Sequence, residues 1–330
     1  MQTRQLGRNG PDVSALGLGC MGFSGGYGPV DDRESIATVH AALDAGVTYL
    51  DTGDFYGAGQ NEMLLAEALK GRREKAFIAV KFGALRGPDG AWLGSDNRPN
   101  AVKNFLAYTL KRLRTDYIDL YQPARVDPAV PIEDTIGAIA DMVKAGFVRH
   151  IGLSEAGADS IRRAHKTHPI AALQIEYSLM SRSVEKQIVP VLRELGISLV
   201  AYGVLSRGLI ADHALTDSPS GEIRLRMPRF TGDNLARNRA LVTALQAIAK
   251  AKGCTTAELA IAWVAARGGD VVPLIGAKRP AQLASALRGL AVKLSADDLA
   301  RIEQAMPAEA VAGTRYGAPL MAHLDSEHAS

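Results

Sequence analysis

The most informative stretch of this chain is residues 49–57, which read Tyr49-Leu50-Asp51-Thr52-Gly53-Asp54-Phe55-Tyr56-Gly57. It begins as a short apolar run, which predicts a buried strand, and Asp51 follows at the carboxyl end of that run. Similar short apolar runs recur along the chain at Ala15–Gly19, Phe77–Val80, Tyr117–Tyr121, Val148–Leu153, Leu173–Glu176, Ile197–Tyr202 and Val271–Ile275. Each of them is expected to be a buried strand.

Segments with helical periodicity lie between these runs. Ile132, Ile136, Ile139 and Val143 are spaced 4, 3 and 4 residues apart, as on one face of an amphipathic helix. Eight strands that alternate with helices match a (β/α)₈ barrel better than a two-domain Rossmann enzyme. We therefore expect a single α/β barrel domain over residues 1–330, with a C-terminal tail from about residue 307.

Two additions to the barrel are expected. The opening residues predict an N-terminal β-hairpin with Asn9-Gly10 as its turn. A long loop is expected after the seventh strand, from Ser206 to Gly232. Long loops in compact domains are usually functional or mobile, and this one follows a strand on the face where barrels carry their active sites.

The composition is that of an ordinary globular protein. The formal net charge of +3 is too small to indicate a nucleic-acid or membrane partner. Cys20 and Cys254 lie far apart, and their spacing predicts neither a disulfide nor a metal site. The chain begins without the apolar core of a signal peptide and has no run of about 18 apolar residues, so we expect a cytoplasmic protein.

A dinucleotide fingerprint, G-x-G-x-x-G, is matched by Gly17-Leu-Gly19-Cys-Met-Gly22. In a Rossmann fold this motif opens directly into a helix that meets the pyrophosphate. Here residues 23–29 have the composition of a turn, and the first helix is expected near Asp32. We therefore reject the Rossmann interpretation, although glycines here also suit a backbone that approaches a flat ligand closely.

Asp51, Tyr56 and Lys81 form a candidate proton relay. A tyrosine hydroxyl has an unperturbed pKa of about 10, so it is an effective acid at neutral pH only when neighbouring charges tune it. A partly buried lysine stabilises phenolate character, and an aspartate keeps that lysine charged. Taken singly, each residue has a simpler explanation as a solvated strand end or a packing residue. However, Asp51, Lys81 and Ser154 all follow predicted strands, whose carboxyl ends meet on one face of a barrel, so together they favour chemistry.

The sequence resembles the aldo-keto reductase superfamily from about residue 4 to about residue 305. The matching segments are residues 51–57, Val148-Arg-His-Ile-Gly-Leu-Ser154-Glu, Gln174-Ile-Glu-Tyr-Ser178, Ala201-Tyr202-Gly-Val-Leu-Ser-Arg-Gly208 and Pro273-Leu-Ile-Gly276-Ala-Lys-Arg279-Pro. The resemblance implies an NADPH-dependent carbonyl reductase on a (β/α)₈ barrel. It also implies that Tyr56 is the proton donor and that Asp51 and Lys81 are its catalytic partners.

The same resemblance implies a set of residues that bind the cofactor, namely Met21, Ser154, Glu155, Gln174, Tyr202, Leu205, Arg207, Gly208, Ile275, Gly276, Lys278, Arg279 and Gln282. Ser154 and Gln174 are expected to hydrogen-bond the nicotinamide carboxamide, and Tyr202 to stack on the nicotinamide ring. Lys278 and Arg279 are expected to meet the ribose 2′-phosphate. Two cations beside a phosphate favour NADPH over NADH, whereas the simpler explanation is a solvated helix start.

Three positions depart from the pattern of the superfamily. Ala124 replaces the histidine that usually precedes Arg125 and orients the substrate carbonyl. Residues 123–128, Pro-Ala-Arg-Val-Asp-Pro, are similar to a bacterial branch that includes pyridoxal reductase-like members, which argues against simple inactivity. Glu155 stands where the usual pattern has Asn, and Ser285 and Ala286 replace residues that often contact adenine.

Two hypotheses about function follow. The first is an enzyme that reduces an aldehyde or ketone to an alcohol, reversibly, with hydride from NADPH and a proton from Tyr56. The second is an NADPH-binding regulatory or redox-sensing subunit with little turnover. The substrate, and whether the protein is a monomer or a homo-oligomer, stay open. Trp92, on the loop after Lys81, is equally consistent with a wall of the substrate pocket and with simple packing.

Overall fold

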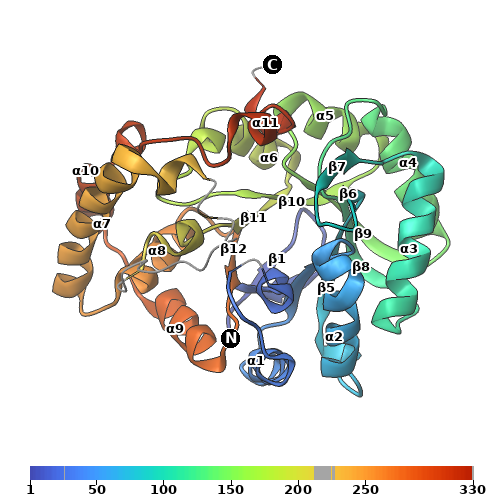
Figure 1. Cartoon of the computed structure of the whole chain (residues 1–330), viewed down its shortest axis with the longest axis horizontal. Coiled ribbons are helices and arrows are strands. Elements are labelled where there is room, and N and C mark those ends of the chain that lie inside the picture. Colours follow the sequence, from blue (N-terminus) through green and yellow to red (C-terminus); the bar gives the residue numbers. More distant parts are fainter. Residues whose placement is uncertain (26, 212–223, 225–226, 329–330) are drawn as a thin grey trace.

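A closed barrel of eight parallel strands forms the centre of the molecule in the computed structural model, which describes residues 1–25, 27–211, 224 and 227–328 (Figure 1). Around the barrel the strands are β3 (Gly17–Gly19), β4 (Tyr49–Gly53), β5 (Phe77–Phe82), β8 (Ile118–Pro123), β9 (Val148–Ser154), β10 (Ile170–Glu176), β11 (Ser198–Tyr202) and β12 (Val271–Gly276). Every apolar run identified in the sequence lies on one of these strands. The prediction of a (β/α)₈ barrel is therefore confirmed.

Helices surround the barrel, and most of them follow a strand in the chain (Figure 1). They are α1 (Asp32–Asp44), α2 (Gln60–Ala68), α3 (Pro99–Leu113), α4 (Ile132–Lys144), α5 (Ala158–Thr167), α6 (Ile188–Leu195), α7 (Gly232–Lys252), α8 (Thr256–Ala265), α9 (Pro280–Ala291), α10 (Ala296–Ala305) and α11 (Ala318–Met321). The periodic segment from Ile132 is α4, whose Ile136 and Ile139 are fully buried against the strands. The apolar face of this helix is the one that its sequence predicts.

The N-terminal hairpin consists of β1 (Thr3–Gln5) and β2 (Asp12–Ser14), which pair antiparallel as expected. Asn9 in its turn has a φ of 68°, a left-handed conformation that asparagine tolerates better than most residues. Leu6 and Val13 are completely buried and pack against the apolar residues that fill the barrel interior. The hairpin therefore closes one end of the barrel.

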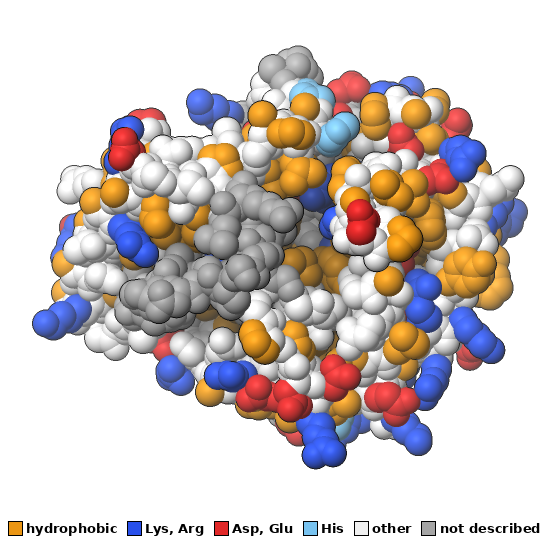
Figure 2. All heavy atoms as spheres, in the orientation of Figure 1, with side chains coloured by type: hydrophobic (Ala, Val, Ile, Leu, Met, Phe, Trp, Pro, Cys, Tyr) orange, Lys and Arg blue, Asp and Glu red, His pale blue; other side chains and the backbone are white. Residues whose placement is uncertain are grey.

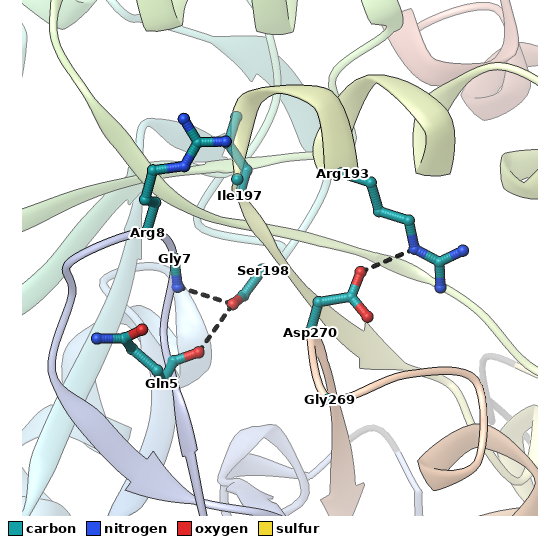
Figure 3. A pocket seen from close by; sticks show the side chains of 9 residues that line it. Gln5, Gly7, Arg8, Arg193, Ile197, Ser198, Gly269 and Asp270 are labelled. Atoms are coloured by element: carbon teal, nitrogen blue, oxygen red, sulfur yellow. Dashed lines mark hydrogen bonds and ion pairs between the residues drawn. The ribbon is translucent and has the colours of Figure 1, made fainter.

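A shallow cavity lies beside this hairpin, where β11 and β12 begin (Figure 3). The Ser198 hydroxyl accepts from the Gly7 amide at 2.7 Å and donates to the Gln5 carbonyl at 3.2 Å. Arg193 pairs with Asp270 on the rim of the cavity, at 3.0 Å. These groups satisfy one another and join the hairpin to the barrel. The cavity is at the amino ends of the strands, a region that serves stability in barrel enzymes.

The register of the parallel strands collects the candidate residues at the opposite end. Asp51 on β4 pairs with Gly19 on β3, and Lys81 on β5 pairs with Gly53 on β4. Further around the barrel, Gln174 on β10 pairs with Ser154 on β9. These residues therefore lie near the carboxyl ends of their strands, which is the face that carries active sites in this fold.

Further segments cover this face. A second hairpin, β6 (Ala84–Arg86) and β7 (Trp92–Ser95), follows β5, and the chain after α10 returns to the barrel before its C-terminus (Figure 1). Much of the long loop predicted between Ser206 and Gly232 lies outside the described residues. Across the ranges that the structure describes, no helix is long and apolar enough to cross a membrane.

Candidate active site

Asp51 lies at the centre of a buried hydrogen-bond network. Lys81 Nζ donates to Asp51 Oδ1 at 2.5 Å, and Gln174 Nε2 donates to Asp51 Oδ2 at 2.6 Å. Asp51 and Lys81 are only 2% and 4% exposed, so their charges interact with little screening by water. The structure thus brings Asp51 and Lys81 together. It also places the side-chain nitrogen of Gln174, a residue expected at the carboxamide, on the same carboxylate.

Tyr56 begins the short 3₁₀ helix η2 (Tyr56–Gly59), directly after β4. Lys81 Nζ lies 5.1 Å from the centre of the Tyr56 ring, and the Phe55 ring packs edge-on against Tyr56 at 4.8 Å. The chain turns sharply here, because Gly57 and Gly59 have φ values of 55° and 92°. Glycine adopts these angles without steric cost, which explains its presence on either side of Ala58 in this motif.

Asn61, at the start of α2, fixes the segment that carries Tyr56. Its side-chain oxygen accepts from the Thr52 hydroxyl at 2.7 Å, and its side-chain nitrogen donates to the Cys20 carbonyl at 2.9 Å and to Ser24 at 2.8 Å. Asn61 is fully buried, so these bonds replace water. Asn61 was not predicted from the sequence. The only available signal was a polar side chain next to an apolar helix face.

Burial raises the pKa of the Tyr56 hydroxyl well above its usual value, and the nearby charge of Asp51 raises it further. The guanidinium of Arg125 opposes both effects. Burial likewise lowers the pKa of Lys81, against the opposing effect of Asp51. The direction for Tyr56 differs from the tuning that we expected, because burial and the charge of Asp51 together outweigh the opposing effect of Arg125 on the pKa of this hydroxyl. A hydroxyl with a raised pKa is fully protonated at neutral pH, so it can act as a proton donor.

The position that usually carries a histidine holds Ala124, which is 1% exposed. Its amide donates to the Phe82 carbonyl at 2.8 Å, so the backbone remains tied to β5. The next side chain, Arg125, donates from Nη1 to the Ala124 carbonyl at 2.5 Å. The charge of Arg125 acts on both Tyr56 and Lys81. The guanidinium of Arg125 therefore lies close to position 124, where the superfamily usually has the imidazole of a histidine.

Glu155, directly after β9, is completely buried and forms an ion pair with the C-terminal segment. Arg315 Nη1 and Nη2 donate to its two oxygens at 2.9 and 2.5 Å. The hydroxyls of Tyr202 and Ser326 donate to the same carboxylate at 2.7 and 2.8 Å. Burial would raise the pKa of Glu155, but Arg315 outweighs it and lowers this pKa to about 2. Arg315 and Ser326 were not found from the sequence, because no motif marks them.

Glu176, at the end of β10, forms the third buried ion pair of this face. Arg207 donates to Oε2 at 2.8 Å, and Arg229 donates to Oε1 at 3.4 Å. Arg207 lies in η5 (Ser206–Gly208), where Ser206 and Arg207 have φ values of 47° and 56°. Left-handed angles at two consecutive non-glycine residues are uncommon and tend to occur at functional sites. The ring of Tyr316 packs against Arg207, 4.7 Å from its guanidinium carbon.

Lys278 and Arg279 lie between β12 and α9, as expected for a phosphate site. Lys278 Nζ donates to the Tyr27 carbonyl at 2.8 Å, which holds its ammonium over the glycine-rich segment after β3. Burial lowers the pKa of Lys278, and the charges of Arg279 and Arg224 lower it further. Mutually repelling cations at a helix start are stabilised by an anion, so these side chains fit the phosphate groups of a dinucleotide cofactor.

The remaining predicted cofactor residues lie on the same face. Gln282 accepts from the Lys278 amide at 2.8 Å, and Met21 begins η1 (Met21–Ser24). Ile275 and Gly276 are the last two residues of β12. Leu205 directly precedes η5, and Gly208 is the last residue of η5. The Ser285 hydroxyl instead contacts Glu258 of α8 at 3.4 Å, and Ala286 is buried. The 13 predicted cofactor positions therefore lie at or just beyond the carboxyl ends of β3, β9, β10, β11 and β12.

The surface view of Figure 2 shows this face in the orientation of Figure 1. Near the middle, basic side chains are visible in a hollow beside the segment that carries the β6–β7 hairpin. Trp92 belongs to that hairpin, and the Arg86 guanidinium lies 5.2 Å from the centre of its ring. The mouth of the barrel is thus rich in arginine. These arginines come from the β6–β7 hairpin, from the loops after the barrel strands and from the C-terminal segment.

Comparisons with known proteins agree with this geometry. The model of the aldo/keto reductase family matches residues 15–307. The "Probable aldo-keto reductase 1" of Glycine max is 45% identical over 96% of this chain and 92% of its own length. Among solved structures, a glycerol dehydrogenase from Gluconobacter oxydans is similar with a TM-score of 0.82 at 26% identity, covering 99% of this chain and 97% of its own. The holo form of an aldo-keto reductase from Bacillus halodurans gives 0.78 at 30% identity, with coverages of 93% and 97%.

Proposed function

This chain belongs to the aldo/keto reductase family, and from that premise we propose that it reduces an aldehyde or ketone to the alcohol with NADPH, with Tyr56 as the proton donor. The family carries out carbonyl reduction that depends on NAD(P)H. The observation that carries the finer proposal is the buried Asp51–Lys81 pair beside the Tyr56 ring, at the carboxyl ends of the strands. A buried ion pair adds little net stability compared with apolar packing, so its position beside a phenol at the carboxyl ends of the strands favours a chemical role.

The chemistry divides between the cofactor and the chain. A reduced nicotinamide, when bound, supplies a hydride to the carbonyl carbon. The Tyr56 hydroxyl donates its proton to the carbonyl oxygen as negative charge develops there, so that the product is the neutral alcohol. The nearby ammonium of Lys81 stabilises the phenolate that remains on Tyr56, and Asp51 holds this ammonium in place through the 2.5 Å hydrogen bond.

Ser154, Gln174 and Tyr202 are the residues that would hold the nicotinamide end. They lie at the ends of β9, β10 and β11, which are adjacent strands of the barrel. Lys278 and Arg279 would hold a ribose 2′-phosphate, and the effect of Arg224 on the pKa of Lys278 places a third cation nearby. Arg279 pairs with Glu34 at 3.3 Å, and the positive charge of Lys278 and Arg224 beside this pair is our reason for proposing NADPH rather than NADH.

The absence of an imidazole at Ala124 has a kinetic consequence. Loss of one donor that polarises a carbonyl typically lowers the rate by about 10²- to 10³-fold. We therefore expect that aldehydes, which are intrinsically more reactive than ketones, are the better substrates. A family of aldehydes is accordingly the first panel to test.

The decisive experiment is a comparison of the purified protein with its Tyr56→Phe variant. We expect the wild-type protein to oxidise NADPH in the presence of aldehydes, followed by the absorbance of the reduced nicotinamide. Tyr56→Phe should abolish turnover but retain NADPH binding, measured by nucleotide fluorescence. Tyr108→Phe is the matched control, because Tyr108 is exposed on the outside of α3. Unchanged turnover in Tyr56→Phe would refute the proton-donor assignment, and tight NADPH binding without turnover on any carbonyl would favour a regulatory subunit.

A further inference from the structure

The charges at the barrel mouth can be assigned to pairs, and the pairing is incomplete. Three of the buried carboxylates at the ends of neighbouring segments form ion pairs, namely Asp51, Glu155 and Glu176. Asp51 pairs with Lys81, Glu155 pairs with Arg315, and Glu176 pairs with Arg207 and Arg229. Each of these three carboxylates therefore already has its cation. Arg86 and Arg125 belong to none of these pairs.

Neither Arg86 nor Arg125 lies within ion-pairing distance of a carboxylate in the described part of the chain. Arg125 donates to the Ala124 carbonyl at 2.5 Å, and Arg86 donates to the Gly90 carbonyl at 3.4 Å. Glu155 acts on Arg125 from beyond hydrogen-bonding distance, and both of its oxygens already accept from Arg315. A guanidinium has five N–H donors, so most of the donors of Arg86 and Arg125 remain available.

Both guanidiniums act on the reacting centre. The charge of Arg125 opposes the effect of burial on the pKa of Tyr56 and contributes to the lowered pKa of Lys81. Burial lowers the pKa of Arg86, and the charge of Arg125 lowers it further. The two cations thus repel each other near the Tyr56 hydroxyl. Burial alone would lower the pKa of Arg125, but the surrounding tyrosines and Glu155 raise it, so Arg125 stays charged and an anion would relieve its repulsion of Arg86.

From this arrangement we propose that the substrate is a carbonyl compound with an anionic group, and that Arg125, assisted by Arg86, binds that group. The chemical class is an aldehyde or ketone that also carries a carboxylate or phosphate. This inference rests on the reductase function proposed above, and it deepens that function by naming the substrate class. Arg125 is then a substrate-binding residue. It directly follows Ala124, the position where the superfamily usually has a histidine.

The two arginines suit different parts of this task. Arg125 is largely shielded by its surroundings, so its hydrogen bonds to an anion are charge-assisted and little screened. Arg86 is exposed on the β6–β7 hairpin, where it stacks near Trp92 and can adjust to substrates of different length. A planar guanidinium matches the two oxygens of a carboxylate or phosphate, which a lysine ammonium matches less well.

Matched pairs of substrates test the proposal. The probes are the 2-, 3- and 4-carboxybenzaldehydes and their methyl esters, which keep the aldehyde and remove the negative charge. We expect at least one acid to exceed its ester by about tenfold or more in kcat/KM with the wild-type protein. For that acid, Arg125→Met should lower kcat/KM by about 10- to 100-fold, chiefly through KM, with a much smaller effect on the ester.

Two further variants and a control make the result specific. Arg125→Lys should retain part of the preference for the acid. Lysine keeps the positive charge but cannot form the two parallel hydrogen bonds that a guanidinium forms with a carboxylate. Arg86→Met, on an exposed hairpin, should weaken the preference without affecting folding. Arg162→Met is the control, because Arg162 is exposed on α5 and pairs with Glu194. Esters that equal or exceed all three acids, or an Arg125→Met variant that loses both substrates equally, would overturn the proposal.

Binding without turnover separates this inference from the reductase function. With NADP⁺ bound the aldehyde cannot be reduced, so calorimetry measures the affinity for each acid and its ester directly. Tighter binding of an acid, lost in Arg125→Met, would support the anion site even if no carbonyl were turned over. If the protein reduces neutral aldehydes but binds no acid more tightly than its ester, the reductase function stands and the anion site is refuted.

Discussion

Removal of Arg315 should destabilise the protein through a buried charge. In Arg315→Met the carboxylate of Glu155 stays buried but loses both charge-assisted hydrogen bonds, at 2.9 and 2.5 Å. The pKa of Glu155 is lowered from 4.5 to about 2, which corresponds to about 3 kcal/mol of stability at neutral pH. Removal of one partner of a buried ion pair typically costs about 3–5 kcal/mol. We therefore expect the free energy of unfolding to fall by about 3 kcal/mol.

The pH dependence identifies the cause of this loss. Because the folded pKa of Glu155 is depressed, its contribution is fully present above about pH 4.5 and is lost as the pH falls toward about 2. In Arg315→Met the buried carboxyl is no longer stabilised in its charged form and takes up a proton more readily. The difference between the wild-type protein and the variant should therefore be largest near neutral pH and narrow on acidification.

Urea denaturation at several pH values, followed by circular dichroism, measures these quantities. The double variant Arg315→Met with Glu155→Gln should be more stable than Arg315→Met alone, because it no longer buries an unpaired charge. The matched control is Arg163→Met, which breaks a pair with Glu133 that also has two hydrogen bonds, at 2.8 and 2.7 Å, but lies on the surface. It should cause a much smaller loss. A loss in Arg315→Met that is constant with pH and is not rescued by Glu155→Gln would refute this reasoning and indicate lost packing instead.

Two other perturbations follow from the site. Lys278→Met should raise KM for NADPH by about tenfold or more and leave KM for NADH nearly unchanged. Initial rates with either cofactor measure both values, and an equal change in the two KM values would contradict a 2′-phosphate contact. The pKa of Asp54 is raised to about 7 by burial and by the neighbouring charge of Glu62, so its stabilising effect is present below the unfolded value of 3.8 and is lost as the pH rises to about 7. Asp54→Asn should therefore raise Tm relative to the wild-type protein at about pH 8 but not at about pH 4, and calorimetry showing the opposite trend would refute this assignment.

The barrel and the positions of its candidate catalytic residues were predictable because short local sequence patterns indicate both. A strand that is buried on both faces appears as an apolar run, and a residue just after that run must lie at the barrel mouth. Asp51 and Lys81 were therefore expected to meet, and the structure places them 2.5 Å apart. The position of Tyr56 followed in the same way from the turn after β4. The direction of its pKa did not follow, because it depends chiefly on how deeply the folded chain buries the hydroxyl.

The partners of Glu155 were not predictable from any local pattern. Arg315 is 160 residues away in the sequence, in a segment without helical or strand periodicity that was expected only as a tail. A basic residue in such a segment is normally solvated. Arg315 is only 5% exposed, and nothing in the sequence indicates this burial. Contacts of this kind become visible only when the path of the chain over the barrel is known.

The location of Arg315 also concerns which segments of the fold hold the candidate catalytic residues and which segments surround them. The family model matches residues 15–307, so Arg315 and Tyr316 lie outside the range that the model covers. The Asp51–Lys81 pair is internal to the barrel, whereas the pairs of Glu155 and Glu176 attach the C-terminal segment and the loop after β11 to the barrel mouth. Buried ion pairs add little net stability compared with apolar packing, but they require one geometry. We infer that these two pairs hold the C-terminal segment and the described parts of the loop after β11 at the barrel mouth. In the function proposed above, residues of the barrel donate the proton and hold the nicotinamide, while segments outside the barrel determine which carbonyl compound enters.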